Sequence, residues 1–542
     1  MEINWQTVLS VIRWCLRPPT KTSNLLILAA SIIWLAIIIL KVTSITADAF
    51  ITFRVVDNFV HGYGLTWNVH ERVQVYTHPL WMFLHIPFYA YWGNILYVTI
   101  SLSIVCTVAA VIVTILTFRQ PWPGTLALFM APLAVSWGFT NNSIMGLENP
   151  LTHCLFACFG WVLLRAGEKR FWFWIAFTCA LSLVNRLDTV FVYIPILCYL
   201  VVARFRSIRF WQCFLGASPI IGWELFSLFY YGFLFPNTKY AKLPSSFFNR
   251  EYITQGLHYL TSIVVFDILS AIFMFIAVII MPLCYIFSRR ARQYIRPEMF
   301  YLALGILWYD LYVISTGGTY LYARFLSLQI FASVWLVYGL YGGLLGSPAR
   351  NLKIKFSYIL LAVALMEFRP MFHPGNVLLR IFPNCLQGGI TFGWNAVSFS
   401  GHHLTRPDGS PPPVAHHDPG FWVTSFTGVG MGGFEMGPSA HIVNPFAITD
   451  PLLARLPNTG VPISQSYIFN TFRETPAGYL DALRTYSLAG MDPDLALYEA
   501  KLRYITSGDL WSMDRLAAIF EFNMGDEDYL LQNYLRSRWW YH

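Results

Sequence analysis

The feature that most constrains this chain is a series of long apolar segments that recur as far as about residue 367 and then stop. A helix needs about 20 mostly apolar residues to cross a hydrocarbon core of roughly 30 Å. Only 12% of the residues are charged and 56% are hydrophobic, which excludes an ordinary water-soluble enzyme. The sequence therefore predicts a polytopic α-helical membrane protein, with a transmembrane domain over residues 1–369 and a soluble domain, the tail, over residues 370–542.

About eleven transmembrane helices are expected. They lie near residues 24–41, 95–117, 124–141, 150–164, 171–184, 189–203, 212–230, 259–287, 299–316, 325–346 and 356–368. Alternate connections carry clusters of Lys and Arg, such as Arg289, Arg290 and Arg292, and such clusters mark the cytoplasmic side. The remaining connections, which we call the five outer connections, then face outward together with the tail. They lie near residues 42–94, 142–149, 185–188, 231–258 and 317–324.

The formal net charge of +8 admits two explanations. One basic surface patch would suggest a nucleic-acid partner, but the Lys and Arg residues form short clusters between apolar segments. Membrane topology explains that distribution, so no nucleic-acid partner is expected.

Ionisable and polar side chains gather in the five outer connections. They are Asp48, Arg54, Asp57, His61 and His78 in the first, Glu148 in the second, Arg186 and Asp188 in the third, Asn237 and Lys242 in the fourth, and Arg324 in the fifth. A single helix through Arg186 and Asp188 would bury both in lipid, at roughly 2.5 to 3.5 kcal/mol each. A turn outside the membrane at this point avoids that cost and is expected.

This set of residues fits the transfer of a group from a phosphorylated lipid. Cations on separate loops can hold a diffuse anion at the level of the lipid headgroups, since Arg offers paired hydrogen bonds to phosphate oxygens. A carboxylate beside them can act as a general base toward an acceptor hydroxyl. The tail would then bind the acceptor.

Most of these residues also have a purely structural explanation. Asp48 could cap the helix that begins at Ala49, as Asp does at helix N-termini. Glu148 could mark a helix start, and Arg186 with Asp188 could form a structural ion pair. Lys242 and Arg324 could be cations that extend from helix ends. His61 and His78 could be structural histidines. Only the gathering of the whole set at one face favours a functional site.

Three stretches of the tail have structural explanations. In "ITDPLLARLP", Asp450 caps a helix that Pro457 ends. The stretch "TGVGMGGFEMGP" lacks the Lys-Ser/Thr pair of a nucleotide loop and is expected to form tight turns. The stretch "PDGSPPPVAHHDPG" is typical of an exposed loop. Its paired histidines could bind a metal ion, and loop composition explains them as well.

Seven stretches carry a resemblance to a known family. They are "DAFITFRVVDNFVHGYGLTWN", "YTHPLW", "GLENPL", "YYGFLFPNTKYAKL", "GGTYLYARF", "GFEMGPSAHIVNPFAITDPLLARLP" and "FRETPAGY". On these motifs the chain resembles the polyprenyl-phosphate-dependent glycosyltransferases of the GT-C superfamily. It is most similar to the terminal arabinofuranosyltransferases of mycobacterial cell walls and the pilin arabinosyltransferases of pseudomonads.

The resemblance implies a GT-C type enzyme of the cytoplasmic (inner) membrane, with a soluble exoplasmic α/β domain at its C-terminus. It would transfer arabinofuranose from a polyprenyl-phosphate donor to a pilin or a cell-surface glycan. Asp48 would be the catalytic residue, and the donor phosphate would be held by Arg186, Arg324, Lys242 and Arg54. The sugar or the acceptor would contact Glu148, Asp188, His61, His78 and Asn237. The lipid-linked sugar is a substrate, so no cofactor is expected.

Two departures from the family pattern affect this interpretation. The family commonly has two consecutive acids where this chain has Ala47-Asp48, and often an acid at the position of Thr319. A divalent metal prefers more oxygen ligands than one carboxylate offers, so no metal is expected. The alternatives are a GT-C transferase for another lipid-linked sugar, or a transporter of lipid-linked sugars. Transporters, however, bury polar groups near the membrane midplane and commonly contain internal repeats, whereas these charges gather at one edge.

Overall fold

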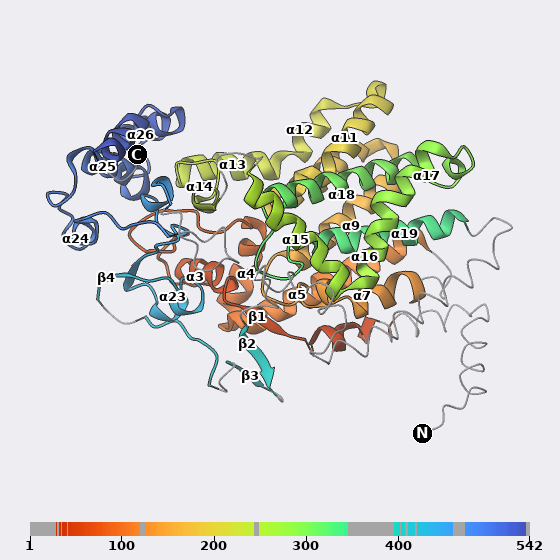
Figure 1. Ribbon diagram of the computed structural model, residues 1–542, viewed down its shortest axis with the longest axis horizontal. Helices are drawn as coiled ribbons and strands as arrows, with labels where there is room; N and C mark the ends of the chain where they lie inside the picture. Colours follow the sequence, from red (N-terminus) through yellow and green to blue (C-terminus); the bar gives the residue numbers. More distant parts are fainter. Residues whose placement is uncertain are drawn as a thin grey trace.

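The structure, a computed structural model, describes residues 29, 32–33, 35–40, 42–119, 126–242, 249–344, 395–400, 403–406, 410–417, 420–458 and 472–537. This part of the chain is mostly helical and contains two small sheets (Figure 1). The α-helices before the tail are α3 (Ala49–Val60), α4 (Pro79–Trp92), α5 (Ile95–Phe118), α7 (Ala131–Val135), α8 (Trp137–Thr140), α9 (Asn149–Arg165), α10 (Phe171–Asn185), α11 (Val190–Ala203), α12 (Phe210–Gly216), α13 (Ser218–Tyr230), α14 (Asn237–Lys242), α15 (Arg250–Phe266), α16 (Ile268–Phe275), α17 (Met281–Phe287), α18 (Pro297–Ser315) and α19 (Ser327–Leu344). The tail contributes α23 (Met431–Met436), α24 (Tyr479–Thr485), α25 (Pro493–Ser507), α26 (Met513–Met524) and α27 (Asp528–Arg536). The strands are β1 (Ser44–Thr46), β2 (Asn395–Ser400), β3 (His403–Thr405), β4 (Trp422–Ser425) and β5 (Ala440–Val443).

Three described helices are long and apolar enough to cross a membrane. They are α5, the continuous helix Ile268–Phe287 that contains α16 and α17, and α18. Helices α12 and α13 would make a fourth span if taken together, although they are bent by 52° where they meet. Shorter apolar helices cover Phe171–Asn185, Leu187–Ala203 and Ser327–Tyr341. The expected span near 356–368, most of the span near 24–41 and the expected domain boundary after residue 369 lie outside the described residues.

Two expected spans, near residues 124–141 and 259–287, are broken in the structure, and one buried carboxylate joins the two breaks. Helix α15 ends just before Asp267, whose side chain caps α16 by accepting from the Ser270 amide at 3.2 Å. The same carboxylate accepts from the hydroxyl of Ser136, between α7 and α8, at 2.6 Å and from the amide of Gly138, in the first turn of α8, at 3.2 Å. The expectation of single helices is wrong here, because hydropathy does not register a carboxylate that satisfies free amides at two helix starts.

The expected interruption of the apolar stretch at Arg186 and Asp188 is present. Helix α10 ends at Asn185, Arg186 has an extended backbone, and one turn of 3-10 helix, η3 (Leu187–Thr189), precedes α11. Later in the first outer connection, residues 79–92 form the helix α4. Pro79 suits its first turn, and Gly93 ends it with a φ of 66°.

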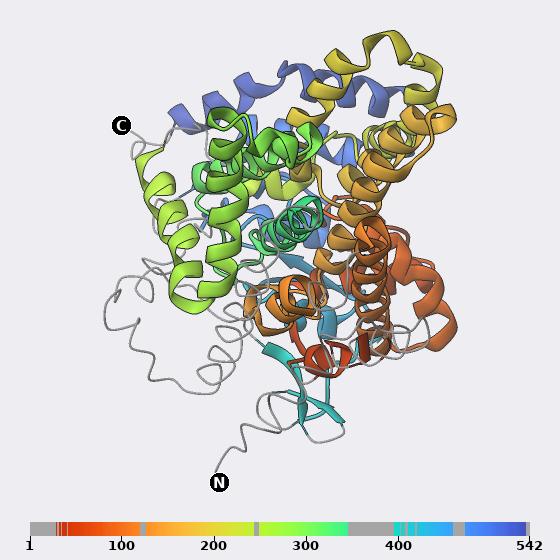
Figure 2. The same cartoon turned by 90° about the vertical axis from the view of Figure 1, so that its right-hand side faces the viewer.

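Helix α19 lies at the centre of the helical part. In Figure 2 it runs between orange helices on one side and green helices on the other, and it contacts α5, α9, α16 and α18. Even its polar residues Ser327, Gln329 and Ser333 are fully buried. A helix surrounded on all sides is expected to be apolar all round, and α19 therefore shows no polar stripe.

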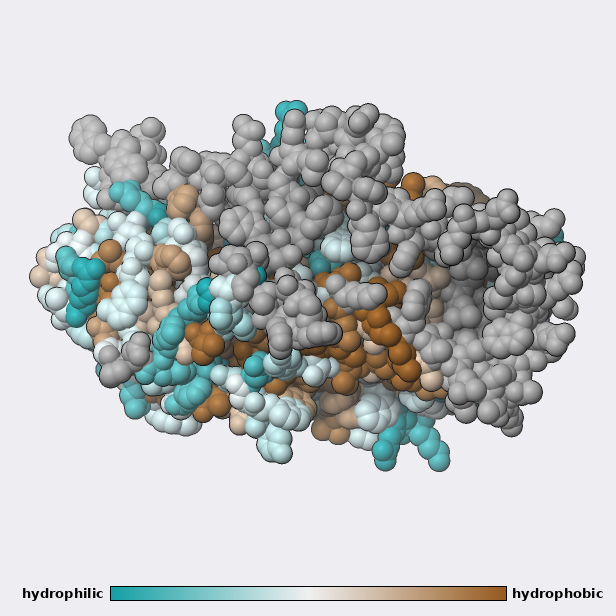
Figure 3. Space-filling view, turned by 90° about the horizontal axis from the view of Figure 1, so that it is seen from below, coloured by the Kyte–Doolittle hydropathy of each residue, from teal (hydrophilic) through white to brown (hydrophobic). Residues whose placement is uncertain are grey.

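Large apolar side chains cover the outside of several helices. Val202 of α11, Phe210 of α12 and Phe287 of α17 are 80%, 76% and 81% exposed. Exposed apolar surface of this extent is unfavourable in water. On the face drawn in Figure 3, hydrophobic side chains gather near the middle, and hydrophilic ones lie mainly at the left, where the tail is. This distribution is compatible with a helical part that contacts lipid.

The tail packs directly on the first outer connection. Strand β1 pairs antiparallel with β2, which pairs with β3, and a separate parallel pair joins β4 and β5. Helix α23 packs on α3 (Figure 1). The buried Arg54 of α3 donates hydrogen bonds to three main-chain oxygens, those of Trp67, Gly433 and Ala440. These bonds fix the tail against the helix that follows Asp48.

Glycines allow this close approach. A Cβ atom at Gly430 would lie 2.2 Å from the main-chain oxygen of Ala47, so only glycine fits beside that backbone. The stretch expected to form tight turns instead contains the helix α23 (Met431–Met436), so that expectation is wrong for its middle. Only its end turns, at Gly437, with a φ of 65°. Asp450 accepts a hydrogen bond at 2.7 Å from the amide of Leu453, the first residue of the 3-10 helix η8 (Leu453–Arg455), although the N-cap position of η8 is Leu452.

Candidate functional site

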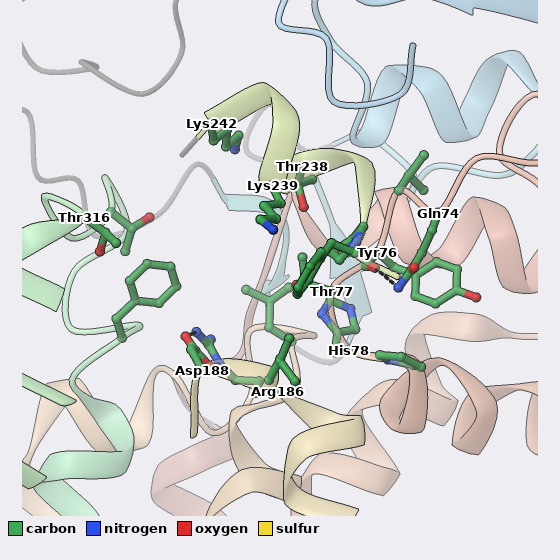
Figure 4. Close-up of a pocket in the computed structure, with 18 of the residues that line it drawn as sticks. Gln74, Tyr76, Thr77, His78, Arg186, Asp188, Thr238, Lys239, Lys242 and Thr316 are labelled. Carbon is green, nitrogen blue, oxygen red and sulfur yellow. Dashed lines mark hydrogen bonds and ion pairs between the residues drawn. The ribbon is translucent and has the colours of Figure 1, made fainter. Parts of the chain in front are cut away.

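A cavity of about 480 Å³ lies where the five outer connections meet. Each connection contributes to its wall: Asp48 and residues 74–79 in the first, Leu147 in the second, Arg186 and Asp188 in the third, Lys239 and Lys242 in the fourth, and Arg324 in the fifth. The tail adds Ile448. Most of the remaining wall is apolar. Segments far apart in the sequence therefore place their ionisable groups around one space (Figure 4).

Asp48 directs its carboxylate into the group of residues around the cavity. It stands immediately before α3, but its side chain makes no capping hydrogen bond to that helix. Instead Oδ1 accepts from the Tyr320 hydroxyl at 2.8 Å, and Oδ2 lies 3.3 Å from Nη1 of Arg324. The side chain of Asp48 is 28% exposed. A carboxylate that is held by two partners and still open to the cavity can accept a proton from a bound molecule.

A chain of buried charges continues from Arg324. Its Nη2 lies 3.7 Å from Oε2 of Glu148, and Oε1 of Glu148 accepts from Arg186 at 2.6 Å. Arg186 also forms a two-pronged ion pair with Asp188, which accepts from the Tyr309 hydroxyl at 3.0 Å. We call Glu148, Arg186 and Asp188 the paired wall. Each of its charges already has an opposite charge as its partner.

The pKa of Glu148 shows which effect controls the paired wall. Burial alone would raise that pKa. His78, which is protonated in the acidic range where Glu148 titrates, and the guanidinium groups of Arg324 and Arg186 outweigh burial and lower it to about 2. Burial in turn lowers the pKa of His78 to about 4, against the attraction of Glu148. The imidazole of His78 is therefore neutral at pH 7, and the two guanidinium groups supply the countercharge. Neutral His78 lies 2.7 Å from the Thr52 hydroxyl and 3.1 Å from Glu148.

Two lysines of α14 form the opposite side of the cavity. Lys239 and Lys242 are three residues apart, so they lie on the same face of this short helix. The side chain of neither lysine forms an ion pair or a hydrogen bond with any described residue. The ammonium group of Lys239 lies 3.3 Å from the centre of the Phe235 ring. Burial lowers the pKa of Lys242, and nearby Arg324 adds to that effect while Asp48 opposes it.

The position of α14 is fixed by the tail. Asn237, at the start of α14, donates hydrogen bonds to the main-chain oxygens of Ala447, Ile448 and Asp450 at 2.9, 3.1 and 3.0 Å. The lysines are therefore held in place by residues more than 200 positions later in the sequence. We call Lys239 and Lys242 the unpaired wall. Figure 4 shows them across the cavity from Arg186 and Asp188.

Not every residue singled out in the sequence lines the cavity. Lys242, Arg186, Asp188, Arg324 and His78 do so, and Glu148 lies directly behind them. Arg54 lies outside, bound to main-chain oxygens, and Asn237 acts through α14. His61 lies at the end of α3, where it approaches Asp57 at 3.3 Å.

Three residues of the cavity were missed in the sequence. Lys239 shares a helix face with Lys242, and its spacing in "NTKYAK" is the signal that could have revealed it. Tyr320 lies within the quoted motif "GGTYLYARF". Glu224 of α13 also lines the cavity, and an acid inside an apolar segment is itself a sign of function.

Among the described residues, one group of three side chains has the composition and spacing of a metal site. It consists of Asp57, His61 and His417, and none of the three lines the cavity.

The chain matches no family model, no curated protein and no solved structure. The geometry of the cavity is therefore the main basis for a functional conclusion.

Proposed function

We propose that the chain is a GT-C type glycosyltransferase that moves arabinofuranose from a polyprenyl-phosphate donor to an exoplasmic acceptor, a pilin or a cell-surface glycan. In this proposal the helical part crosses the cytoplasmic membrane about eleven times, and the cavity and the tail, as an α/β domain, face outward. One observation carries the proposal: a partly open carboxylate and two unpaired ammonium groups share a cavity that is otherwise bounded by the paired wall and by largely apolar side chains.

The donor would bind with its phosphate at the unpaired wall. An anion that enters the cavity can neutralise Lys239 and Lys242 without breaking an existing ion pair. Arg324 can assist, because one edge of its guanidinium group has only the 3.7 Å contact with Glu148. Arg186 is occupied by two carboxylates, so we assign it to the support of the site. The apolar wall, including Phe191, suits the first isoprene units of the lipid.

Asp48 would act as the general base. It takes the proton from the acceptor hydroxyl, the acceptor oxygen bonds to the anomeric carbon of the sugar, and the bond from that carbon to the phosphate oxygen breaks. The bonding electrons leave with polyprenyl phosphate, and Asp48 later releases its proton to water. Tyr320 and Arg324 hold the carboxylate in position through the contacts described above. A positioned general base contributes about 10²- to 10⁴-fold to a rate.

The purified protein in lipid vesicles, supplied with synthetic polyprenyl-phosphate sugars and acceptor, tests this proposal. We expect release of polyprenyl phosphate that depends on acceptor and is fastest with the arabinofuranose donor. Faster release with a hexose donor would retain the transferase and change the sugar. Movement of the intact donor across the bilayer without release would instead identify a transporter and overturn the proposal.

A further inference from the structure

A second site lies at the other end of α3, where that helix meets the tail. Asp57 and His61 are one helical turn apart on α3, and His417 comes from the tail segment 410–417. One ligand atom from each residue lies within 4.8 Å of the other two. Nδ1 of His61 lies 3.3 Å from Oδ1 of Asp57, and Nε2 of His417 lies 3.1 Å from Oδ2.

The carboxylate of Asp57 is buried without a Lys or Arg of the described residues in direct contact. Asp57 is only 2% exposed, and no Lys or Arg among the described residues forms an ion pair with it. Arg54, three residues earlier, attracts Asp57 electrostatically but donates its hydrogen bonds to three main-chain oxygens instead. Burying a carboxylate without a positive partner is costly, so the position favours a bound cation.

The surroundings are those of a metal ligand set. Nδ1 of His61 donates to the main-chain oxygen of Asp57 at 2.8 Å, which leaves Nε2 of that ring with its free electron pair. The Tyr89 hydroxyl donates to Oδ1 of Asp57 at 2.6 Å. Metal-bound His and carboxylate side chains are typically oriented by such secondary hydrogen bonds. The side chains of His61 and His417 are 44% and 31% exposed, so an ion can enter from solvent.

We propose that Asp57, His61 and His417 bind one Zn²⁺ ion, with water as the fourth ligand. Ligands about 2.0 to 2.1 Å from a tetrahedral Zn²⁺ lie roughly 3.3 Å from one another. Nε2 of His417 lies 3.1 Å from Oδ2 of Asp57, and one ligand atom from each of the three residues lies within 4.8 Å of the other two. Two imidazoles and one carboxylate suit Zn²⁺ better than Ca²⁺ or Mg²⁺, which prefer oxygen ligands. For a given nitrogen and oxygen site, Zn²⁺ also binds more tightly than Fe²⁺.

The ion would act as a clamp between the tail and α3. It joins the segment that contains His417 to the helix whose first residue follows Asp48. Arg54 and α23 already hold the tail to the same helix, so the ion would strengthen an existing interface. The site lies outside the cavity and requires no assumption about the reaction. Its confirmation or failure is therefore independent of the proposed transfer.

Zinc titration of the full-length protein, after removal of metals with a chelator, tests the clamp. We expect one Zn²⁺ per chain by calorimetry and a higher unfolding temperature with Zn²⁺, and no such shift with Ca²⁺ or Mg²⁺. His417→Ala should abolish both effects. The matched control is His416→Ala, which removes the neighbouring exposed histidine and should leave both effects unchanged.

Asp57→Asn provides a second variant that keeps the shape of the side chain. It should fold with unchanged circular dichroism and bind Zn²⁺ far more weakly. Equal loss of binding in the His416 and His417 variants would show adventitious binding by loop histidines and overturn the proposal. An absence of Zn²⁺ binding in the unaltered protein, or a larger stabilisation by Ca²⁺, would overturn it as well.

Discussion

The two sides of the cavity differ in whether their charged side chains have partners of opposite charge. On the paired wall, Glu148 is fully buried between two arginines, and Arg186 shares its guanidinium group between two carboxylates. On the unpaired wall, the ammonium groups of Lys239 and Lys242 face the cavity with no acidic partner among the described residues. A network whose charges already have opposite partners resists change and suits a scaffold, whereas cations without acidic partners suit a site that an anionic ligand completes. Asp48 stands between the two, held by Arg324 and open to the cavity.

The largest expected effect comes from Asp48, where the two sides meet. Asp48→Asn keeps the size of the side chain and removes the base, so the turnover rate should fall by about 10²- to 10⁴-fold. Release of polyprenyl phosphate in vesicles measures this change. Asp481→Asn, which alters an exposed acid of the tail, is the matched control and should retain full activity. Undiminished activity of the Asp48 variant would remove that residue from the mechanism.

The paired wall should be needed for stability. Glu148→Gln leaves two buried guanidinium groups with too little negative charge, and breaking a buried pair in this way costs about 3–5 kcal/mol. Thermal unfolding in detergent, followed by circular dichroism, measures the loss. Glu251→Gln, at an exposed position in the first turn of α15, should change stability by less than about 0.5 kcal/mol. A stable Glu148 variant would contradict the view that the paired wall is the scaffold.

The unpaired wall should be needed for donor binding and not for stability. Lys239→Ala and Lys242→Ala each remove one charged contact to phosphate, which is worth about 1.5 to 3 kcal/mol. The KM for the donor should rise about tenfold or more, with little change in unfolding temperature. Arg250→Ala, an exposed cation outside the cavity, is the control. If both lysine variants unfolded early and bound donor normally, the assignment of the two walls would be reversed.

The smallest effect concerns acids of the tail that, unlike Glu148, gain too little positive charge to offset burial. Burial, opposed by Arg503 and reinforced by Asp450, raises the pKa of Glu499 to about 7, and burial raises that of Asp450 to about 6. A raised pKa gives stability that is full below the ordinary value near 4.5 and is lost as the pH rises through about 7. The free energy of unfolding should therefore fall by the order of 1–3 kcal/mol between pH 5 and pH 8.

The pKa of Glu148 predicts the opposite pH dependence of stability, which distinguishes the paired wall from the buried acids of the tail. Its lowered pKa gives stability that is full above the ordinary value and is lost only as the pH falls toward about 2. The contribution of the paired wall to stability should therefore not change between pH 5 and pH 8. The free energy of unfolding should depend less on pH over that range in Glu499→Gln, because this variant removes a titrating group of the tail. An unchanged slope would show that other groups control the dependence.

Part of this arrangement follows from the sequence. The helices α5 and α18 and the break at Arg186 could be predicted, because hydropathy and the cost of charges in lipid act locally. The broken spans could not, since Ser136 and Asp267 bond across more than 100 residues. The position of Arg54 could not be predicted for the same reason, because its acceptors Gly433 and Ala440 lie far along the sequence in the tail.

The sequence could predict which residues belong to the candidate site better than it could predict the role of each. The charge of Lys242, Arg186 and Arg324 is visible in the sequence, and so is their place in outer connections. Which cations already have acidic partners depends on how the connections meet in space. A charge pattern alone could not separate Arg186, held by Glu148 and Asp188, from Lys239, which has no acidic partner among the described residues.

A structure of the protein with bound polyprenyl phosphate tests the division between the two walls most directly. We expect the phosphate oxygens within about 3 Å of the ammonium groups of Lys239 and Lys242, the lipid along the apolar wall, and the contacts between Glu148 and Arg186 unchanged. A phosphate bound at Arg186 with its carboxylates displaced, or bound outside the cavity, would contradict the account.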